Sequence, residues 1–149
     1  MYNHAPMRLR MKPLCGCMLV LALALTAGSC SMAKYKENAE RAVTKFHQHL
    51  NAEQYQEIYN ESDPLFKQNV TEPDGIALFG AVHAKLGSVK NATAVGWHVN
   101  ATTSGTFVTV AYNVDFSEGK GTEQFAFKVT ANDALLVRYD INSPLLITK

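Results

Sequence analysis

The chain has 149 residues, and its 14 Lys and Arg against 13 Asp and Glu give a formal net charge of +1. Three of the basic residues and none of the acidic ones lie in the first 29 positions, so the remaining 120 residues carry 11 basic and 13 acidic side chains, a net charge of −2. This balance provides neither the basic patch of a nucleic-acid-binding protein nor a polybasic surface for anionic lipids. A stretch of this length suffices for one domain and is too short for two.

Residues 1–29 have the composition of an export signal. Arg8, Arg10 and Lys12 precede the uncharged apolar run Leu14–Leu25, and small residues follow the run. As a helix, this run spans about 18 Å, whereas the hydrocarbon core of a bilayer is about 30 Å thick. We therefore predict a signal peptide and not a membrane-spanning helix.

A cysteine stands at the end of this signal. The stretch Ala27–Cys30 resembles the lipobox of bacterial lipoproteins, with Ala27 at the position where leucine is usual. The resemblance implies a diacylglycerol on the thiol of Cys30 and a further acyl chain, such as palmitate, on its amine; two or more chains hold a protein firmly to a membrane. The next residue is Ser31 and not aspartate, which resembles the outer-membrane sorting pattern and implies a lipid anchor at the periplasmic face of the outer membrane. The alternative is an ordinary cleaved signal with a chance cysteine.

The remaining sequence predicts no metal and no organic cofactor. Cys15 and Cys17 lie inside the signal and Cys30 would carry lipid, so the domain has no thiol left for a disulfide or a metal site. A phosphate-binding loop, a dinucleotide fingerprint, a zinc-protease motif and a nucleophile elbow are all absent from the sequence.

We expect residues 30–36 to form a lipidated tether and residues 37–149 a single domain. Helical spacing of apolar residues predicts an amphipathic helix over 39–50 and a short second helix over 55–59, with a restart at Ser62–Pro64. A third helix begins after Thr71, a capping residue, and ends at Gly87.

After Gly87 the period changes from helical to alternating. Four strands are predicted, over 89–99, 108–116, 125–129 and 135–141. Helices followed by hairpin-linked strands indicate an α+β fold with three N-terminal helices packed on a four-stranded antiparallel meander. The alternation places Thr93, Val95, Trp97, Leu135 and Val137 on the inner face of the sheet and Leu136 on the outer face.

This order of elements resembles the cone-shaped nuclear transport factor two-like and cystatin-like folds, in which the sheet is curved. Residues 36–142 are also similar to an uncharacterised family of small secreted bacterial proteins. That similarity rests on Phe46-His47, the run Tyr55–Tyr59, Phe66-Lys67 and Leu86-Gly87. The resemblance implies a pocket between sheet and helices and transfers no catalytic residue to this chain.

Three aromatic residues, Trp97, Tyr112 and Tyr139, fall on the inner face of the predicted strands. Apolar rings with polar tips suit the wall of a ligand pocket, although such aromatics more often fill a core. Both interpretations remain open.

The histidines are the candidates for acid–base chemistry. His83 shares the apolar stripe of the last helix, so it is either a cavity acid/base or a core-edge histidine bonded to the backbone or a tyrosine. His47 and His49 are two positions apart on a helix and point in different directions, and we expect both at the surface. The period turns Glu123 inward only near a turn, so a pair of cavity carboxylates is not predicted.

These observations favour a membrane-anchored envelope lipoprotein whose domain is a non-catalytic binding or accessory module. Its expected partners are the membrane, through the lipid, and a protein or a small apolar ligand, but no nucleic acid. The alternative function is a small cavity enzyme that uses His83 as its acid/base.

Overall fold

The structure is a computed structural model that describes residues 26–147 of the chain. Most of the predicted signal peptide, residues 1–25, lies outside the described residues, and the side chain of Cys30 lies outside the description as well. The fold reported below is that of the compact unit that begins at Ser31.

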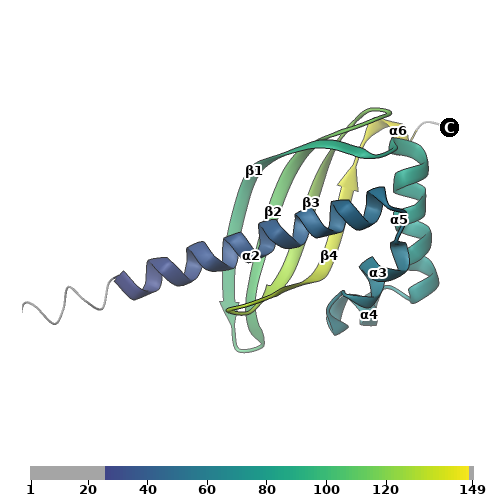
Figure 1. Cartoon of the computed structure of the whole chain (residues 1–149). Helices are drawn as coiled ribbons and strands as arrows, with labels where there is room; N and C mark the ends of the chain where they lie inside the picture. Colours follow the sequence, from purple (N-terminus) through teal and green to yellow (C-terminus); the bar gives the residue numbers. More distant parts are fainter. Residues whose placement is uncertain (1–25, 148–149) are drawn as a thin grey trace, which may run out of the picture. The chain divides into compact units, whose positions relative to one another are not determined.

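The described part of the chain is an α+β domain in which helices precede an antiparallel sheet (Figure 1). The strands are hydrogen-bonded in the order β1-β2-β3-β4, so the predicted class and the predicted four-stranded meander are both confirmed. The elements are α2 (Thr26–Asn51), α3 (Tyr55–Asn60), α4 (Pro64–Asn69), α5 (Glu72–Leu86), β1 (Val89–Thr102), β2 (Gly105–Phe116), β3 (Lys120–Val129), β4 (Ala134–Asn142) and α6 (Pro144–Ile147). Within the described residues, four helices precede the sheet where the sequence predicted three, because α3 and α4 are separate elements.

Helix α2 begins before the predicted amphipathic helix. Residues 31–36, predicted as a tether, are helical and belong to α2. The ion pair between Lys36 Nζ and Glu40 Oε1, 2.6 Å apart, supports this part of the helix through its four-residue spacing. Further along, the buried residues Ala39, Val43 and Phe46 recur every three or four positions and define the face of α2 that enters the core.

Local capping signals fix the ends of α4 and α5. The side chain of Asp63 accepts a hydrogen bond from the backbone N–H of Leu65, 2.9 Å away, and Pro64 occupies the first helical position. Thr71 caps α5 in the same way, and Gly87 follows the helix with a φ of 74°. A left-handed φ favours glycine, so the predicted end of the helix at Gly87 is confirmed.

Three inserted residues, one in β4 and two in β1, change which residues face inward. In β4, Arg138 pairs with Ala126 and Leu136 pairs with Phe127, so Val137 is an extra residue in the ladder. Leu136 pairs with the inward Phe127 and is buried on the inner face, whereas Leu135 pairs with Lys128, so the predicted faces of Leu135 and Leu136 were wrong. An inserted residue reverses the alternation on one side of a bulge.

The other two inserted residues, Lys90 and Val95, lie in β1. Ala94 pairs with Tyr112 and Gly96 pairs with Ala111, which leaves Val95 without a partner across the ladder. Because Lys90 is inserted, Thr93 pairs with the exposed Asn113, and the predicted inward position of Thr93 was wrong. Val95 itself is 57% exposed.

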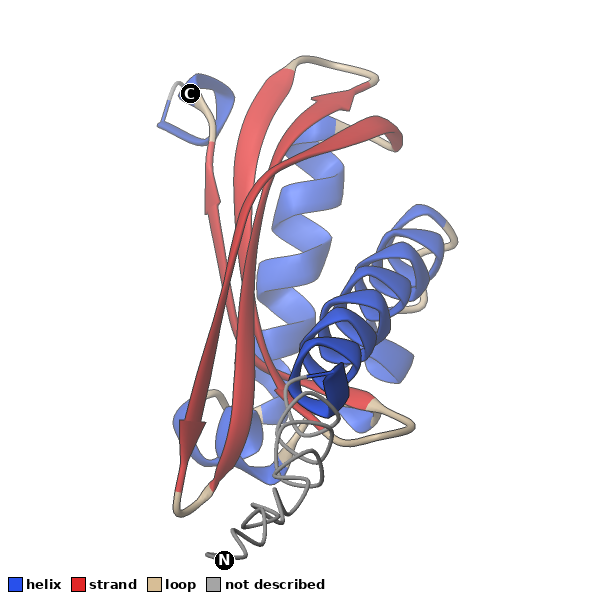
Figure 2. Ribbon diagram, turned by 90° about the vertical axis from the view of Figure 1, so that its left-hand side faces the viewer, coloured by secondary structure: helices blue, strands red, loops and turns tan. Residues whose placement is uncertain are grey.

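Aromatic rings join the helices to the sheet at the centre of the core. The ring of Phe46 from α2 lies 5.1 Å from that of Phe125 in β3 and 4.9 Å from that of Tyr139 in β4. Phe79 from α5 lies 5.6 Å from Phe46 on the same side. Figure 2 shows the two long helices, α2 and α5, on one side of the sheet. The buried inner face of the sheet is therefore covered by both.

Candidate functional site

A cavity of about 460 Å³ lies between α2, the end of α3 and the β3–β4 hairpin. We call it the helix–hairpin cavity. Its volume lies in the usual range for small-molecule sites, about 300–1,000 Å³. Apolar side chains from all three walls line it, namely Phe46, Ile58, Phe127 and Leu136, and its polar lining includes Arg41, Lys45, His49, Glu61 and Asp133. It therefore combines apolar surface with charged groups of both signs.

Hydrogen bonds between backbone and side chains hold the walls together. The backbone N–H of Asp63 donates to the carbonyl of Leu136 at 2.9 Å, which joins the segment after α3 to the edge of β4. The side-chain amide of Asn38 donates to the carbonyl of Thr130 at 3.0 Å, which joins α2 to the hairpin. Because Asn38 and Asp63 are themselves buried, these links are shielded from water.

Three basic side chains line the α2 wall. Arg41, Lys45 and His49 are spaced four residues apart, so they lie along one face of the helix and all border the cavity. The spacing of these residues was visible in the sequence. What the sequence did not show is that this face of α2 borders a cavity.

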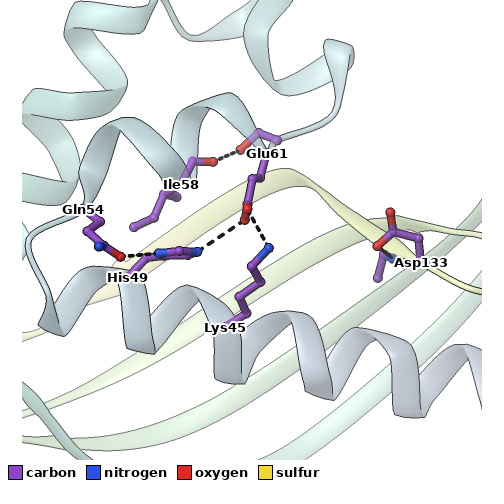
Figure 3. Close-up of polar contacts among 8 residues, drawn as sticks. Lys45, His49, Gln54, Ile58, Glu61 and Asp133 are labelled. Carbon is purple, nitrogen blue, oxygen red and sulfur yellow. Dashed lines mark hydrogen bonds and ion pairs between the residues drawn. The ribbon is translucent and has the colours of Figure 1, made fainter.

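Two of the basic residues converge on one carboxylate. Lys45 Nζ lies 2.5 Å from Glu61 Oε1, and His49 Nε2 lies 3.4 Å from Glu61 Oε2. Figure 3 shows Lys45 and His49 extending from α2 toward Glu61, with Asp133 apart from them. Lys45 and Glu61 are 55% and 42% exposed, and an exposed ion pair contributes only about 0–1 kcal/mol to stability.

Gln54 holds the imidazole of His49 at Nδ1, the ring nitrogen that does not face Glu61. Nδ1 lies 2.7 Å from Oε1 of Gln54, and the two side chains share a hydrogen bond. Nε2 is buried and makes no hydrogen bond of its own within the described structure, although the carboxylate of Glu61 is near. The second nitrogen is therefore directed at an acidic group without a formed hydrogen bond.

A second group of ionisable side chains is sealed in the core. His47 Nε2 lies 2.6 Å from Glu123 Oε2, and the hydroxyl of Tyr139 donates to Glu123 Oε1 at 2.7 Å. Glu123 is 1% exposed and His47 is 8% exposed. The predicted surface position of His47 was wrong, because His47 lies on the buried face of α2 beside Phe46, whereas His49 borders the cavity. Burial, and then the charge and hydrogen bond of Glu123, raise the pKa of Tyr139 well above its ordinary value.

Glu123, which the strand period turned inward only near a turn, lies on the inner face within β3. It pairs with Tyr112 on β2 and Ile141 on β4, in the middle of the sheet, and both its oxygens have partners. Neither it nor its two partners line the helix–hairpin cavity. A fully bonded and enclosed carboxylate holds the core together, and a substrate in this cavity would not reach it.

The three aromatic residues predicted to line a pocket lie elsewhere. Tyr112 and Tyr139 are buried in the core, and burial together with the charge of Glu40 raises the pKa of Tyr112. Trp97 faces inward opposite Val110, but it is 47% exposed because it stands on the edge strand. None of the three lines the helix–hairpin cavity.

His83 also lies away from this cavity. It is half-buried in the last turn of α5, its Nε2 is 3.5 Å from the hydroxyl oxygen of Ser88, and its ring centre is 6.3 Å from that of Tyr55. A general base needs a substrate site within hydrogen-bond reach, and the cavity described above does not include this residue.

The described residues contain no group of three or more His, Cys, Asp or Glu side chains placed to hold a metal ion. Between residues 26 and 147 there is also no helix with the length and apolar character needed to cross a membrane. Comparison of the chain with protein-family models gives no match, and comparison with curated proteins gives none either. The site is therefore interpreted from its own geometry.

Proposed function

We propose that the chain is a lipid-anchored envelope protein whose domain binds a small molecule with an apolar body in the helix–hairpin cavity, without catalysis. The observation that carries this proposal is the cavity itself, about 460 Å³ with Phe46, Ile58 and Leu136 in its wall. A preformed concave site of this kind, with a few charged groups at its border, is typical of small-molecule binding.

The non-catalytic interpretation rests on where the acid–base groups lie. The carboxylate of Glu123 has both oxygens bonded inside the core, and His83 lies outside the cavity wall. Among the charged groups that border the cavity, Lys45 and Glu61 form an ion pair with each other. This arrangement suits recognition of a ligand, since His49, the histidine of the cavity wall, faces the carboxylate of Glu61.

The anchor part of the proposal rests on the sequence before Ser31. A basic segment, an apolar run and the stretch Ala27–Cys30 stand in the order of a lipoprotein signal. From Ser31 on, where burial is described, positions 31–34 of α2 are exposed and Asn38 is the first buried residue. We propose a lipid at Cys30, at the periplasmic face of the outer membrane, and a cone-like domain in which the helices cover a curved sheet.

Fatty-acid labelling tests the anchor. Cells that express the protein and are fed a radioactive fatty acid should label the wild type and the variant Cys17→Ala, whose thiol lies inside the predicted signal. Cys30→Ala should carry no label, because the acceptor thiol is absent. Equal labelling of Cys30→Ala and wild type contradicts the anchor, whatever the outcome for the cavity.

Filling the cavity tests the binding function. Ala42 lines the helix–hairpin cavity, whereas Ala84 is exposed on α5 outside it. We expect the variant Ala42→Trp to abolish binding of the fluorescent amphipathic probe anilinonaphthalene sulfonate, and Ala84→Trp to bind it as the wild type does. Circular dichroism of each variant verifies folding. Unchanged probe binding by folded Ala42→Trp contradicts the proposal.

A further inference from the structure

The carboxylate of Glu61 lies where the charged group of a ligand would bind. It borders the helix–hairpin cavity, and each of its two oxygens faces a different basic side chain: Oε1 faces Lys45 Nζ at 2.5 Å and Oε2 faces His49 Nε2 at 3.4 Å. Lys45 supplies one donor and His49 supplies a second when its imidazole is protonated, and two such donors form a binding site for a planar carboxylate.

The basic side chains are positioned by the fold and not by Glu61 alone. Lys45 and His49 are one helical turn apart on α2, and Gln54 holds Nδ1 of His49 at 2.7 Å. Nε2 of His49 is buried without a hydrogen bond of its own in the described structure. An imidazolium could donate from both nitrogens, so this position still has a hydrogen bond to offer a carboxylate that fits more closely than Glu61 does.

Glu61 itself is able to leave this position. It is the residue that follows α3, its side chain is 42% exposed, and its backbone N–H remains bonded to the carbonyl of Glu57 at 3.0 Å. Only the side chain has to rotate into water. The exchange of one carboxylate for another leaves Lys45 paired, and because the Lys45–Glu61 pair is exposed, breaking it costs only about 0–1 kcal/mol.

We propose that the ligand of the helix–hairpin cavity is an amphipathic monocarboxylate, whose carboxylate displaces Glu61 from Lys45 and His49 while its apolar body contacts Phe46, Ile58 and Leu136. This inference rests on the proposed binding function and adds the chemical class of the ligand. Glu61 then acts as a built-in competitor, which keeps the anion site paired when no ligand is bound. The charge complementarity that favours a carboxylate is the basic row on α2, in which Arg41 is the third member.

The test compares an anionic and a neutral ligand of equal chain length, octanoate and octanol. The full chain, purified from membranes and held in lipid nanodiscs, is titrated calorimetrically with each ligand, and empty nanodiscs provide the blank for partition into lipid. Glu61→Gln removes the competing charge, so we expect octanoate to bind on the order of tenfold more tightly than to the wild type, equivalent to about 1.4 kcal/mol. Octanol affinity should be unchanged.

Two further variants make the comparison specific. Glu40→Gln removes a carboxylate that also pairs with a lysine of α2, Lys36, but outside the cavity. It should bind both ligands as the wild type does. Lys45→Met should weaken octanoate binding about tenfold or more without changing octanol binding.

The outcomes separate this inference from the proposed function. The carboxylate assignment is overturned if folded Glu61→Gln binds octanoate no more tightly than the wild type does and the wild type binds octanol as tightly as octanoate. In that case the cavity is an apolar binding site. Glu61→Ala provides a second variant if Glu61→Gln does not fold. If neither ligand binds the wild type, and anilinonaphthalene sulfonate binds Ala42→Trp as it binds the wild type, the proposed binding function is contradicted. This inference is then contradicted as well.

Discussion

His47 and Glu123 are 76 positions apart in the sequence, and the structure brings Nε2 of the histidine to within 2.6 Å of Oε2 of the glutamate. The pair joins α2 to β3 inside the core, and Tyr139 of β4 completes it with a hydrogen bond of 2.7 Å to the other carboxylate oxygen. A carboxylate that is 1% exposed is tolerated only when its oxygens are paired. The three residues therefore depend on one another for stability.

Removal of the histidine alone should destabilise the domain strongly. His47→Leu leaves the buried carboxylate of Glu123 without its basic partner, and breaking a buried pair in this way costs about 3–5 kcal/mol. Urea unfolding followed by circular dichroism measures the loss. The matched variant replaces the whole group, His47→Leu with Glu123→Leu and Tyr139→Phe. We expect it to be more stable than His47→Leu alone, since no buried charge remains. A triple variant less stable than the single one contradicts this account.

The raised pKa of Tyr139 should appear as a loss of stability in alkali. In the unfolded chain a tyrosine releases its proton near pH 10, whereas in the folded protein burial and the charge of Glu123 raise the pKa well above that value. Above about pH 10 the unfolded state therefore binds fewer protons than the folded state, and the free energy of unfolding falls as the pH rises. Below that pH this tyrosine contributes no pH dependence.

Tyr139→Phe isolates this effect. The variant should lose stability less steeply than the wild type when urea unfolding is repeated at increasing pH above about 10. Some slope remains in the variant, because burial also raises the pKa of Tyr112 and of Tyr55. Equal slopes for the two proteins would show that the phenol of Tyr139 does not keep its proton more firmly in the folded state.

Asn51 joins the end of α2 to the start of β1, because its side chain bonds both backbone groups of Val89. Its side-chain amide donates to the carbonyl of Val89 at 3.1 Å, and its side-chain carbonyl accepts from the backbone N–H of Val89 at 2.8 Å. Asn51→Asp cannot donate, so we expect a loss of about 0.5–1.5 kcal/mol in urea unfolding. Asn91→Asp introduces the same charge on β1, where the side chain is exposed and makes only a 3.4 Å contact with Thr93. A loss as large as that of Asn51→Asp in this control would contradict the bridging role.

The parts of the fold that local sequence dictates were predictable, and those that depend on register were not. Thr71 and Gly87 mark the ends of α5 because a cap and a positive φ are properties of the neighbouring residues. Val137, the extra residue in β4, carries no such signal, since its bulge exists only in relation to β3. One inserted residue was enough to reverse the predicted faces of Leu135 and Leu136.

The same distinction applies to the site. The four-residue spacing of Arg41, Lys45 and His49 is a local property, and the sequence displays it. The partner of two of them, Glu61, directly follows another helix, α3, and only the fold of the chain brings it to α2. The pairing of His47 with Glu123 similarly requires both the rotation of α2 about its axis and the position of β3, and neither can be read from nearby residues.

Two glycines of α5 provide a matched test of the packing between α3 and α5. A Cβ added at Gly75 would lie 2.8 Å from Cδ2 of Tyr59, whereas a Cβ added at Gly80 would lie 3.5 Å from Cε2 of Tyr55, an ordinary contact. Tyr59 is buried, and its hydroxyl donates to the carbonyl of Val70 at 3.0 Å, so its ring cannot yield without loss of that hydrogen bond.

Alanine should therefore have opposite effects at the two positions. Gly80→Ala should raise the free energy of unfolding by about 0.5–1 kcal/mol, because alanine favours a helix interior over glycine. Gly75→Ala gains the same propensity but overpacks the contact with Tyr59, at a cost of about 1–3 kcal/mol, so a net loss of stability is expected. Urea unfolding of the two variants beside the wild type measures both. Stabilisation by Gly75→Ala equal to that of Gly80→Ala would mean that α3 moves freely against α5, and that Tyr59 does not fix their separation.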